Sequence, residues 1–191
     1  MTLFDKIMAR FGQMSIPARA NEPMSAHTTF RIGGPARVFC TPNSQVQLAQ
    51  AIMACRELGL RYYLLGRGSN VLFADEGYEG VVIQIGSKLG DIQVDGRRVT
   101  AGAGALLAHV CLAAAEAGLA GLEFAYGIPG CVGGGVYMNA GAYGGEMKDI
   151  LENATFFDDQ LREVTLSAAD LHLGYRTSAF ELMPWCILRA S

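Results

Sequence analysis

The chain has 191 residues, of which 51% are hydrophobic and 17% charged, and its formal net charge is −3. That length suits one domain or two small ones. Its Lys and Arg residues are scattered, which argues against binding to nucleic acid or to an anionic membrane, and no stretch approaches the ~20 apolar residues of a membrane span. We therefore expect a small molecule as the partner.

The five cysteines are widely spaced, without a C-x-x-C pair or a Cys/His group that could hold zinc. We therefore predict no metal site and expect each cysteine to be a small buried hydrophobe. The N-terminus has no charged segment leading into a continuous apolar run, which a secretory signal would have. These features favour a reduced, cytoplasmic protein.

The first two predicted elements lie in residues 3–42. Residues 3–14 carry apolar side chains at helical spacing, which predicts an amphipathic helix that packs on the domain rather than on a membrane. The run "HTTFRIGGPARVFCTP", residues 27–42, is rich in β-forming residues. It predicts β-structure with its turn at Gly33-Gly34-Pro35.

A helix and two strands are expected next. Asn43 or Ser44 can cap a helix that runs to about Leu58 and is closed by the glycine after it. "RYYLLG", residues 61–66, then predicts a buried strand, and "GVVIQIG", residues 80–86, predicts another.

The following segment predicts a hairpin and a helix. "DIQVDGRRVTAG", residues 91–102, reads as two strands joined at Asp95-Gly96, which fits a two-residue type I′ turn. Residues 105–117 are rich in alanine and leucine and predict a helix closed by Gly118.

The last part of the chain predicts a second hairpin over residues 152–167, turning at Asp158-Asp159, and a short helix that begins at Ser167. Strands occur in hairpins and also beside helices, so the fold class is α+β and a Rossmann fold is disfavoured. "GSKLG", residues 86–90, is a candidate boundary between two parts of the chain.

The loop "GRGSN" follows a predicted strand and consists of Gly66, Arg67, Gly68, Ser69 and Asn70. Its glycines let backbone N–H groups converge on one point, which makes a nest for an anion such as phosphate. A plain tight turn is the alternative. The loop matches neither the spaced dinucleotide fingerprint nor a Walker loop, because no G-K-[ST] follows.

A second loop, "GIPGCVGG", consists of Gly127, Ile128, Pro129, Gly130, Cys131, Val132, Gly133 and Gly134. Large side chains are missing over a length that suits a flat or extended ligand lying against the backbone. A close helix–sheet contact is the alternative. Two such loops together favour a pyrophosphate joined to a ring system, as in a dinucleotide.

Four motifs, in this order and at these spacings, resemble the UDP-N-acetylenolpyruvoylglucosamine reductase family, also called UDP-N-acetylmuramate dehydrogenase. They are "HTTFRIGGPA", "LLGRGSNVLFADEG", "GLEFAYGIPGCVGGGVYMNAGAYGGEMKD" and "GYRTSAF". The resemblance covers roughly residues 20–190 and is closest to the second of the family's two types.

This resemblance implies a two-lobed FAD-binding domain of the vanillyl-alcohol-oxidase (PCMH) type. Residues 1–20 would form an N-terminal helix and linker, residues 21–86 the first lobe and residues 87–191 the second lobe. The loop at residues 66–70 would receive the FAD pyrophosphate, and the loop at residues 127–134 would line the pyrophosphate and flavin, with Asn139 beside it.

The reaction implied by the resemblance is a hydride relay from NADPH through FAD to an enolpyruvyl sugar nucleotide. Arg176 in "GYRTS" matches the family's catalytic arginine, which can bind a carboxylate through two parallel hydrogen bonds. Tyr175 beside it is either part of the site or a packing aromatic. The family's proton-donating serine and assisting glutamate match no residue of this chain, and the resemblance places them in a C-terminal substrate-binding domain that we expect to be absent.

Two functions remain open from the sequence. The chain is either part of a complete flavin-dependent reductase or a non-catalytic FAD-binding fragment that binds flavin without turnover. A different small flavin oxidase is disfavoured, because "GYRTSAF" following "AGAYGGE" would not be expected there. The sequence does not predict the oligomeric state.

Overall fold

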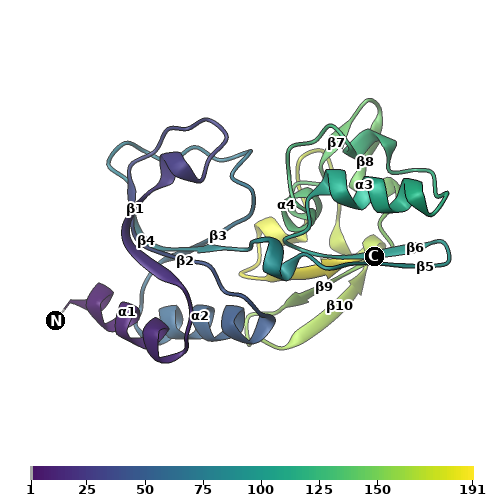
Figure 1. Ribbon diagram of the computed structural model, residues 1–191. Helices are drawn as coiled ribbons and strands as arrows, with labels where there is room; N and C mark the ends of the chain where they lie inside the picture. The colour runs from purple at the N-terminus through teal and green to yellow at the C-terminus, as the bar shows by residue number, and fades with distance from the viewer. Residues whose placement is uncertain (1) are drawn as a thin grey trace. The chain divides into compact units, whose positions relative to one another are not determined.

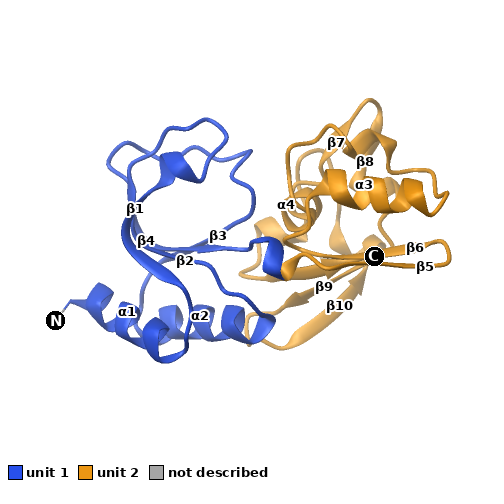
Figure 2. Cartoon of the chain, in the orientation of Figure 1, with its two compact units in different colours: residues 1–88 blue, residues 89–191 orange. Residues whose placement is uncertain are grey.

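The computed structural model describes residues 2–191 (Figure 1). They fold as two compact units that divide between Lys88 and Leu89 (Figure 2). The resemblance places the lobe boundary between residues 86 and 87, two residues before this division, and the candidate boundary at residues 86–90 contains it. The first helix of the chain belongs to the N-terminal unit.

A four-stranded mixed sheet with strand order β1-β2-β4-β3 forms the centre of the N-terminal unit. β1 runs antiparallel to β2, whereas β2 and β3 run parallel to β4. The inner strand β4 buries Val81, Val82 and Ile83 completely, as its continuous apolar run predicts. The bounds are β1 (Ala18–Pro23), β2 (Pro35–Cys40), β3 (Tyr62–Leu65) and β4 (Tyr78–Gln84).

Two helices lie along one face of this sheet, α1 (Leu3–Gln13) and α2 (Gln45–Glu57) (Figure 1). Both predicted helices are confirmed. The N-cap of α2 is Ser44 rather than Asn43, because the Ser44 hydroxyl accepts a hydrogen bond from a backbone N–H in the first turn. Gly59 follows with φ +63°, the left-handed conformation that commonly ends a helix.

The prediction of β-structure over residues 27–42 is wrong in its first half. Residues 27–34 form no strand, and β2 begins only at Pro35. The backbone of Gly34 passes so close to another loop that a Cβ there would lie 2.0 Å from the Asp75 carbonyl oxygen. This packing between loops was not visible in a pattern of β-forming residues.

Two further strand predictions need correction. β1 is a strand that no sequence pattern predicted, because its residues "ARANEP" bury little of their surface. The strand at β3 is confirmed, but it is an edge strand rather than a buried one: Leu65 is its buried residue, and Tyr63 is 39% exposed.

The C-terminal unit is built on a five-stranded antiparallel sheet with strand order β10-β9-β11-β6-β5. Both predicted hairpins, β5–β6 and β9–β10, are part of this sheet, and β11 joins them. The bounds are β5 (Ile92–Asp95), β6 (Arg98–Gly102), β9 (Asn153–Phe157), β10 (Glu163–Ser167) and β11 (Cys186–Ala190).

Helices α3 (Leu107–Glu116) and α4 (Val132–Tyr137) cover one face of this sheet, together with a small hairpin (Figure 1). α3 confirms the helix predicted before Gly118, which has φ +71°. The small hairpin pairs β7 (Gly141–Ala142) with β8 (Gly145–Glu146). Short 3₁₀ turns complete the chain: η1 (Met24–Ala26), η2 (Ser87–Leu89), η3 (Glu123–Ala125), η4 (Met147–Asp149), η5 (Ala168–Leu171) and η6 (Ala179–Glu181).

The β5–β6 turn lies one residue later than predicted. Asp95 pairs with Arg98, so the two loop residues are Gly96 and Arg97. Gly96 has φ +58°, whereas Arg97 is not among the residues with positive φ. A type I′ turn needs positive φ at both positions, so a glycine at the first position alone fits type II′ instead.

Candidate functional site

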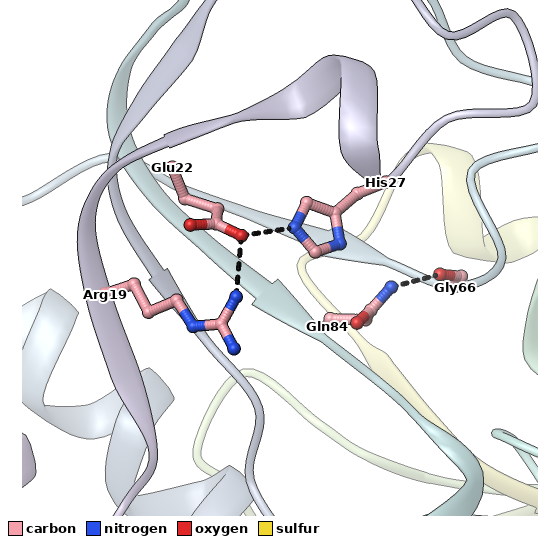
Figure 3. Close-up of polar contacts among 5 residues, drawn as sticks. All are labelled: Arg19, Glu22, His27, Gly66 and Gln84. Atoms are coloured by element: carbon pink, nitrogen blue, oxygen red, sulfur yellow. Dashed lines mark hydrogen bonds and ion pairs between the residues drawn. The ribbon is translucent and has the colours of Figure 1, made fainter.

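The loop at residues 66–70 follows β3 directly and rests on the segment that contains His27. Gly68 has φ +71°, and a Cβ on it would lie 2.0 Å from the His27 carbonyl oxygen. The backbone N–H of Thr29 donates to the Gly68 carbonyl at 2.9 Å, and the Gln84 side chain donates to the Gly66 carbonyl at 3.4 Å (Figure 3). These contacts determine the path of the loop, while the side chains of Arg67 and Asn70 are exposed and Ser69 is half-buried.

The segment beneath this loop is itself held by an ionic cluster (Figure 3). His27 Nε2 lies 2.9 Å from Glu22 Oε1, and the same oxygen accepts a hydrogen bond from Arg19 at 2.9 Å. The His27 ring also stacks on Phe39, with the ring centroids 4.0 Å apart. His27 is therefore a structural residue that supports the loop.

We expect the Glu22 cluster to stabilise the N-terminal unit in a pH-dependent way. The hydrogen bond from His27, assisted by Arg19, lowers the pKa of the Glu22 carboxyl below its usual value of 4.5. A lowered pKa means that the stabilisation is complete above about pH 4.5 and is lost as the pH falls through the folded-state value. Glu22→Gln should lower the free energy of unfolding by about 1 kcal/mol at pH 7. Urea unfolding from pH 7 to pH 3 should show the two proteins converging, and a difference that persists at pH 3 would contradict this assignment.

The second glycine loop lies along residues 103–107 of the same unit. Leu107 donates its N–H to the Gly130 carbonyl at 3.0 Å, Val132 donates to Ala105 at 2.9 Å, and Gly133 donates to Ala103 at 2.9 Å. These bonds resemble a short β-ladder that leads directly into α4. These backbone hydrogen bonds therefore fix the loop to the rest of the C-terminal unit.

The glycines of this region differ in why they lack a side chain. A Cβ on Gly133 would lie 3.0 Å from the Ala103 Cβ, and one on Gly135 would lie 3.4 Å from Leu107. Close packing therefore accounts for these two. A Cβ on Gly127 would meet no atom within 4 Å, and one on Gly134 would meet only the Cys131 sulfur at 3.9 Å. The fold itself does not require glycine at positions 127 and 134, both of which are exposed and lack positive φ.

The remaining residues of this loop differ in exposure. Cys131 and Val132 are buried, Ile128 and Gly130 are half-buried, and Pro129 is exposed. All five cysteines of the chain are buried thiols, as the sequence predicts. Burial raises the pKa of the Cys55 thiol to about 12 and also raises that of Cys40, which keeps both protonated and unreactive at neutral pH.

Asn139 lies two residues beyond the end of α4 and is buried, with 3% of its surface exposed. Its side-chain amide donates to Glu146 and to the Gly174 carbonyl, the latter at 2.9 Å, and its carbonyl oxygen accepts from the Lys148 N–H at 2.9 Å. Both amide hydrogens are engaged within the protein. A direct contact between this side chain and FAD stays a prediction.

Arg176 lies in a four-residue turn whose ends are Gly174 and Thr177, which exchange backbone hydrogen bonds of 3.0 and 3.3 Å. Tyr175 and Arg176 are at its tip, and both are exposed. Arg176 has φ +56°, a conformation that favours glycine and is strained for arginine. The structure thus brings Asn139 to the base of the turn that presents Arg176, a connection that the sequence does not reveal.

No spacing rule could have revealed the partners of Asn139. Glu146 and Lys148 follow it by seven and nine residues and reach it only because the β7–β8 hairpin folds back.

Among residues 2–191, no group of three or more His, Cys, Asp or Glu side chains could hold a metal ion. None of the helices that the structure describes is long and apolar enough to cross a membrane.

A family model described as "FAD binding domain" matches residues 36–167. The chain belongs to this FAD-binding domain family. FAD is therefore the family's cofactor, in agreement with the cofactor that the motifs imply. The match contains both glycine loops and runs from the second residue of β2 to the end of β10.

Curated relatives of this FAD-binding domain are named UDP-N-acetylenolpyruvoylglucosamine reductase. The protein of Clostridium botulinum (strain Hall) is 46% identical over 171 residues, which cover 90% of this chain and 56% of the relative. That of Caldicellulosiruptor bescii is 45% identical over 170 residues, which cover 89% and 54%. The resemblance stated from the motifs is confirmed, and the chain spans little more than half the length of these relatives.

Solved structures with a similar fold agree with this family assignment. The crystal structure of UDP-N-acetylenolpyruvylglucosamine reductase (MurB) from Thermus caldophilus matches with a TM-score of 0.73 and 35% identity, covering 92% of this chain and 60% of that one. A chitooligosaccharide oxidase matches with a TM-score of 0.69 at 18% identity, covering 96% of this chain and 42% of that one, which shows the fold alone. The predicted α+β, two-lobed FAD-binding fold of the vanillyl-alcohol-oxidase type is thereby confirmed.

Proposed function

We propose that this chain is the FAD-binding part of a cytoplasmic reductase that converts UDP-N-acetylglucosamine enolpyruvate to UDP-N-acetylmuramate with NADPH, a step of peptidoglycan precursor synthesis. The observation that carries the proposal is the pair of glycines, Gly127 and Gly134, whose missing side chains the fold does not explain. Their open positions fit a ligand that lies against the backbone. The identity to the named relatives supports FAD and the enolpyruvyl sugar nucleotide as the ligands.

Each glycine loop has a distinct part in binding. The backbone N–H groups of residues 66–70 would donate to the pyrophosphate oxygens, a task that suits a glycine nest. The backbone of residues 127–134 would lie against the flavin and exclude water from it. Bound FAD supplies the chemistry, since it accepts a hydride from one substrate and donates a hydride to another.

Arg176 would bind the substrate carboxylate. Its guanidinium is always charged and can donate two parallel hydrogen bonds to a carboxylate. Negative charge moves toward this carboxylate when a hydride is added to the neighbouring alkene, so the arginine would stabilise the transition state more than the ground state. The strained turn at residues 174–177 holds the side chain at an exposed tip.

Two residues near this turn do not suit the role of proton donor. The Ser178 hydroxyl is buried and donates to the Tyr137 carbonyl at 2.7 Å. The Glu146 carboxylate binds the Asn139 amide and also lies 2.5 Å from the Lys148 ammonium. Both groups are occupied by structural contacts, which supports the expectation that the serine and glutamate of the reaction lie outside this chain.

The visible absorption spectrum tests the proposal. The purified chain is mixed with FAD, the excess is removed, and NADPH is added without oxygen. We expect a retained flavin band that NADPH bleaches. Consumption of the enolpyruvyl sugar nucleotide is then measured in the chain extended to the length of its curated relatives, where the proposal expects turnover. Bleaching without consumption in that longer chain would favour the alternative, a non-catalytic FAD-binding fragment. A folded protein that retains no flavin would contradict both.

Gly134→Ala should separate cofactor binding from folding. The added methyl group meets little protein and favours the helix, so the free energy of unfolding should stay equal or rise by roughly 0.5–1 kcal/mol. FAD affinity should nevertheless fall at least about tenfold, because the methyl occupies the space of the ligand. Gly12→Ala is the matched control: Gly12 is also helical, exposed and open to a Cβ, and this variant should keep full affinity for FAD. Unchanged FAD affinity in Gly134→Ala would argue against a flavin at this loop.

A further inference from the structure

We propose that Asn139 is a positioning residue for Arg176, and that α4 links the flavin-binding loop to the arginine through it. The proposal rests on the proposed function, in which Arg176 binds the substrate carboxylate. It assigns Asn139 to the arginine turn, whereas the sequence resemblance assigns it to the cofactor. All the residues involved lie in the C-terminal unit.

The orientation of the Asn139 side chain is determined by its three partners. Its amide nitrogen faces two acceptors, the Glu146 carboxylate and the Gly174 carbonyl, while its oxygen faces the Lys148 N–H. A flipped amide would place oxygen against two acceptors and nitrogen against a donor. Only one orientation is therefore satisfied, and it directs an N–H at Gly174.

The Gly174 carbonyl is the start of the turn that carries Arg176. This oxygen accepts from the Thr177 N–H within the turn at 3.3 Å and from the Asn139 amide at 2.9 Å. The bond from Asn139 thus anchors the turn at its base. Such an anchor matters because Arg176 has φ +56° and the surroundings must oppose its relaxation to an ordinary conformation.

The other arm of the turn is anchored to the same segment. The Ser178 hydroxyl donates to the Tyr137 carbonyl at 2.7 Å, and Tyr137 is the last residue of α4. Residues 137 and 139 therefore bind both arms of the turn, on either side of Arg176. Neither bond involves the Arg176 guanidinium: one ends at the Gly174 carbonyl and the other starts from the Ser178 hydroxyl.

α4 has only six residues, Val132–Tyr137, and its first residues belong to the glycine loop. One end of this helix therefore carries the loop that we assign to the flavin, and the residues at its other end hold the arginine turn. A short helix is a rigid spacer at 1.5 Å per residue. The arrangement gives Arg176 a constant distance from the flavin loop, which a hydride transfer to a bound carboxylate substrate requires.

Asn139→Gly tests this inference, because glycine accepts the φ of +42° at this position while the side chain with its amide is removed. Hydrogen exchange at the Thr177 amide, measured on this chain, should accelerate at least about tenfold. In the chain extended to the length of its curated relatives, kcat/KM should fall about 10- to 100-fold, while the Kd for FAD stays unchanged. In an Arg176→Gly background, which has no cation to position, the same substitution should cause no further loss. Asn21→Gly is the matched control, since Asn21 also has positive φ (+53°) and is exposed in the other unit.

Three results would overturn the inference. The first is unchanged exchange at Thr177, and the second is a weakened affinity for FAD, which would assign Asn139 to the cofactor instead. The third is a loss of activity that is equally large in the Arg176→Gly background, which would indicate a general structural role. Failure of the proposed function would look different: the extended wild-type protein would not reduce the enolpyruvyl sugar nucleotide, while the exchange at Thr177 would still respond to Asn139→Gly.

Discussion

Gly68→Ala is expected to destabilise the N-terminal unit by about 3 kcal/mol and to abolish FAD binding. Two costs add at this position. A non-glycine residue in the left-handed region costs roughly 1–2 kcal/mol, and the new Cβ would lie 2.0 Å from the His27 carbonyl oxygen, an overlap that forces the backbone to shift at a further cost of about 1–3 kcal/mol. The shift would displace the N–H groups that we assign to the pyrophosphate. Urea unfolding and titration with FAD measure the two effects.

Gly59→Ala is the control for Gly68→Ala. Gly59 lies in the same unit with φ +63°, but a Cβ there would meet nothing within 4 Å. The free energy of unfolding of Gly59→Ala should fall only by the roughly 1–2 kcal/mol that a non-glycine residue costs in the left-handed conformation. Its affinity for FAD should stay unchanged. Equal losses in the two variants would mean that the contact with His27 contributes nothing.

Arg176→Gly is expected to make the protein more stable and the enzyme nearly inactive. Glycine adopts φ +56° without strain, so the free energy of unfolding of this chain should rise by about 1 kcal/mol. In the chain extended to the length of its relatives, kcat/KM should fall about 10²- to 10³-fold, because the charge that we propose to stabilise the developing anion is gone. A substitution that raises stability and lowers activity is typical of a strained functional residue.

Two controls accompany the Arg176 variant. Arg31 also has φ +56° and is exposed, so Arg31→Gly should raise stability by a similar amount and leave the activity unchanged. Arg176→Lys keeps the charge but loses the two parallel hydrogen bonds, and its activity should lie between those of the wild type and Arg176→Gly. Full activity in Arg176→Gly would remove the arginine from the mechanism.

The elements that the sequence predicted well are those whose signals are local. The N-cap at Ser44 and the closing glycines Gly59 and Gly118 lie within a few residues of the helices that they bound. The two hairpins likewise join strands that are neighbours in the chain. The predictions were wrong where contacts between distant segments determine the backbone conformation. Residues 27–34, for example, pack against another loop instead of forming a strand.

The candidate site also has features that the sequence predicts and features that only the tertiary structure shows. The two glycine loops and Arg176 could be named from the sequence, because their residue types and order resemble a known family. Nothing in the order of residues distinguishes Gly133 from Gly134, yet a Cβ on the first would press against Ala103 and one on the second would meet almost nothing. The difference depends on which face of α4 lies against the neighbouring chain.

By itself, the sequence determined the α+β class and the helices, and it singled out the two glycine loops and the arginine as candidates, since each depends on local propensity or on a contiguous motif. Only the tertiary structure decided which glycines are required by packing and which leave space for a ligand. It also decided that Asn139 binds the carbonyl of Gly174, 35 residues away. Such contacts form because the β7–β8 hairpin and the turn at residues 174–177 pack next to the end of α4. A pattern within one segment of the sequence does not predict that packing.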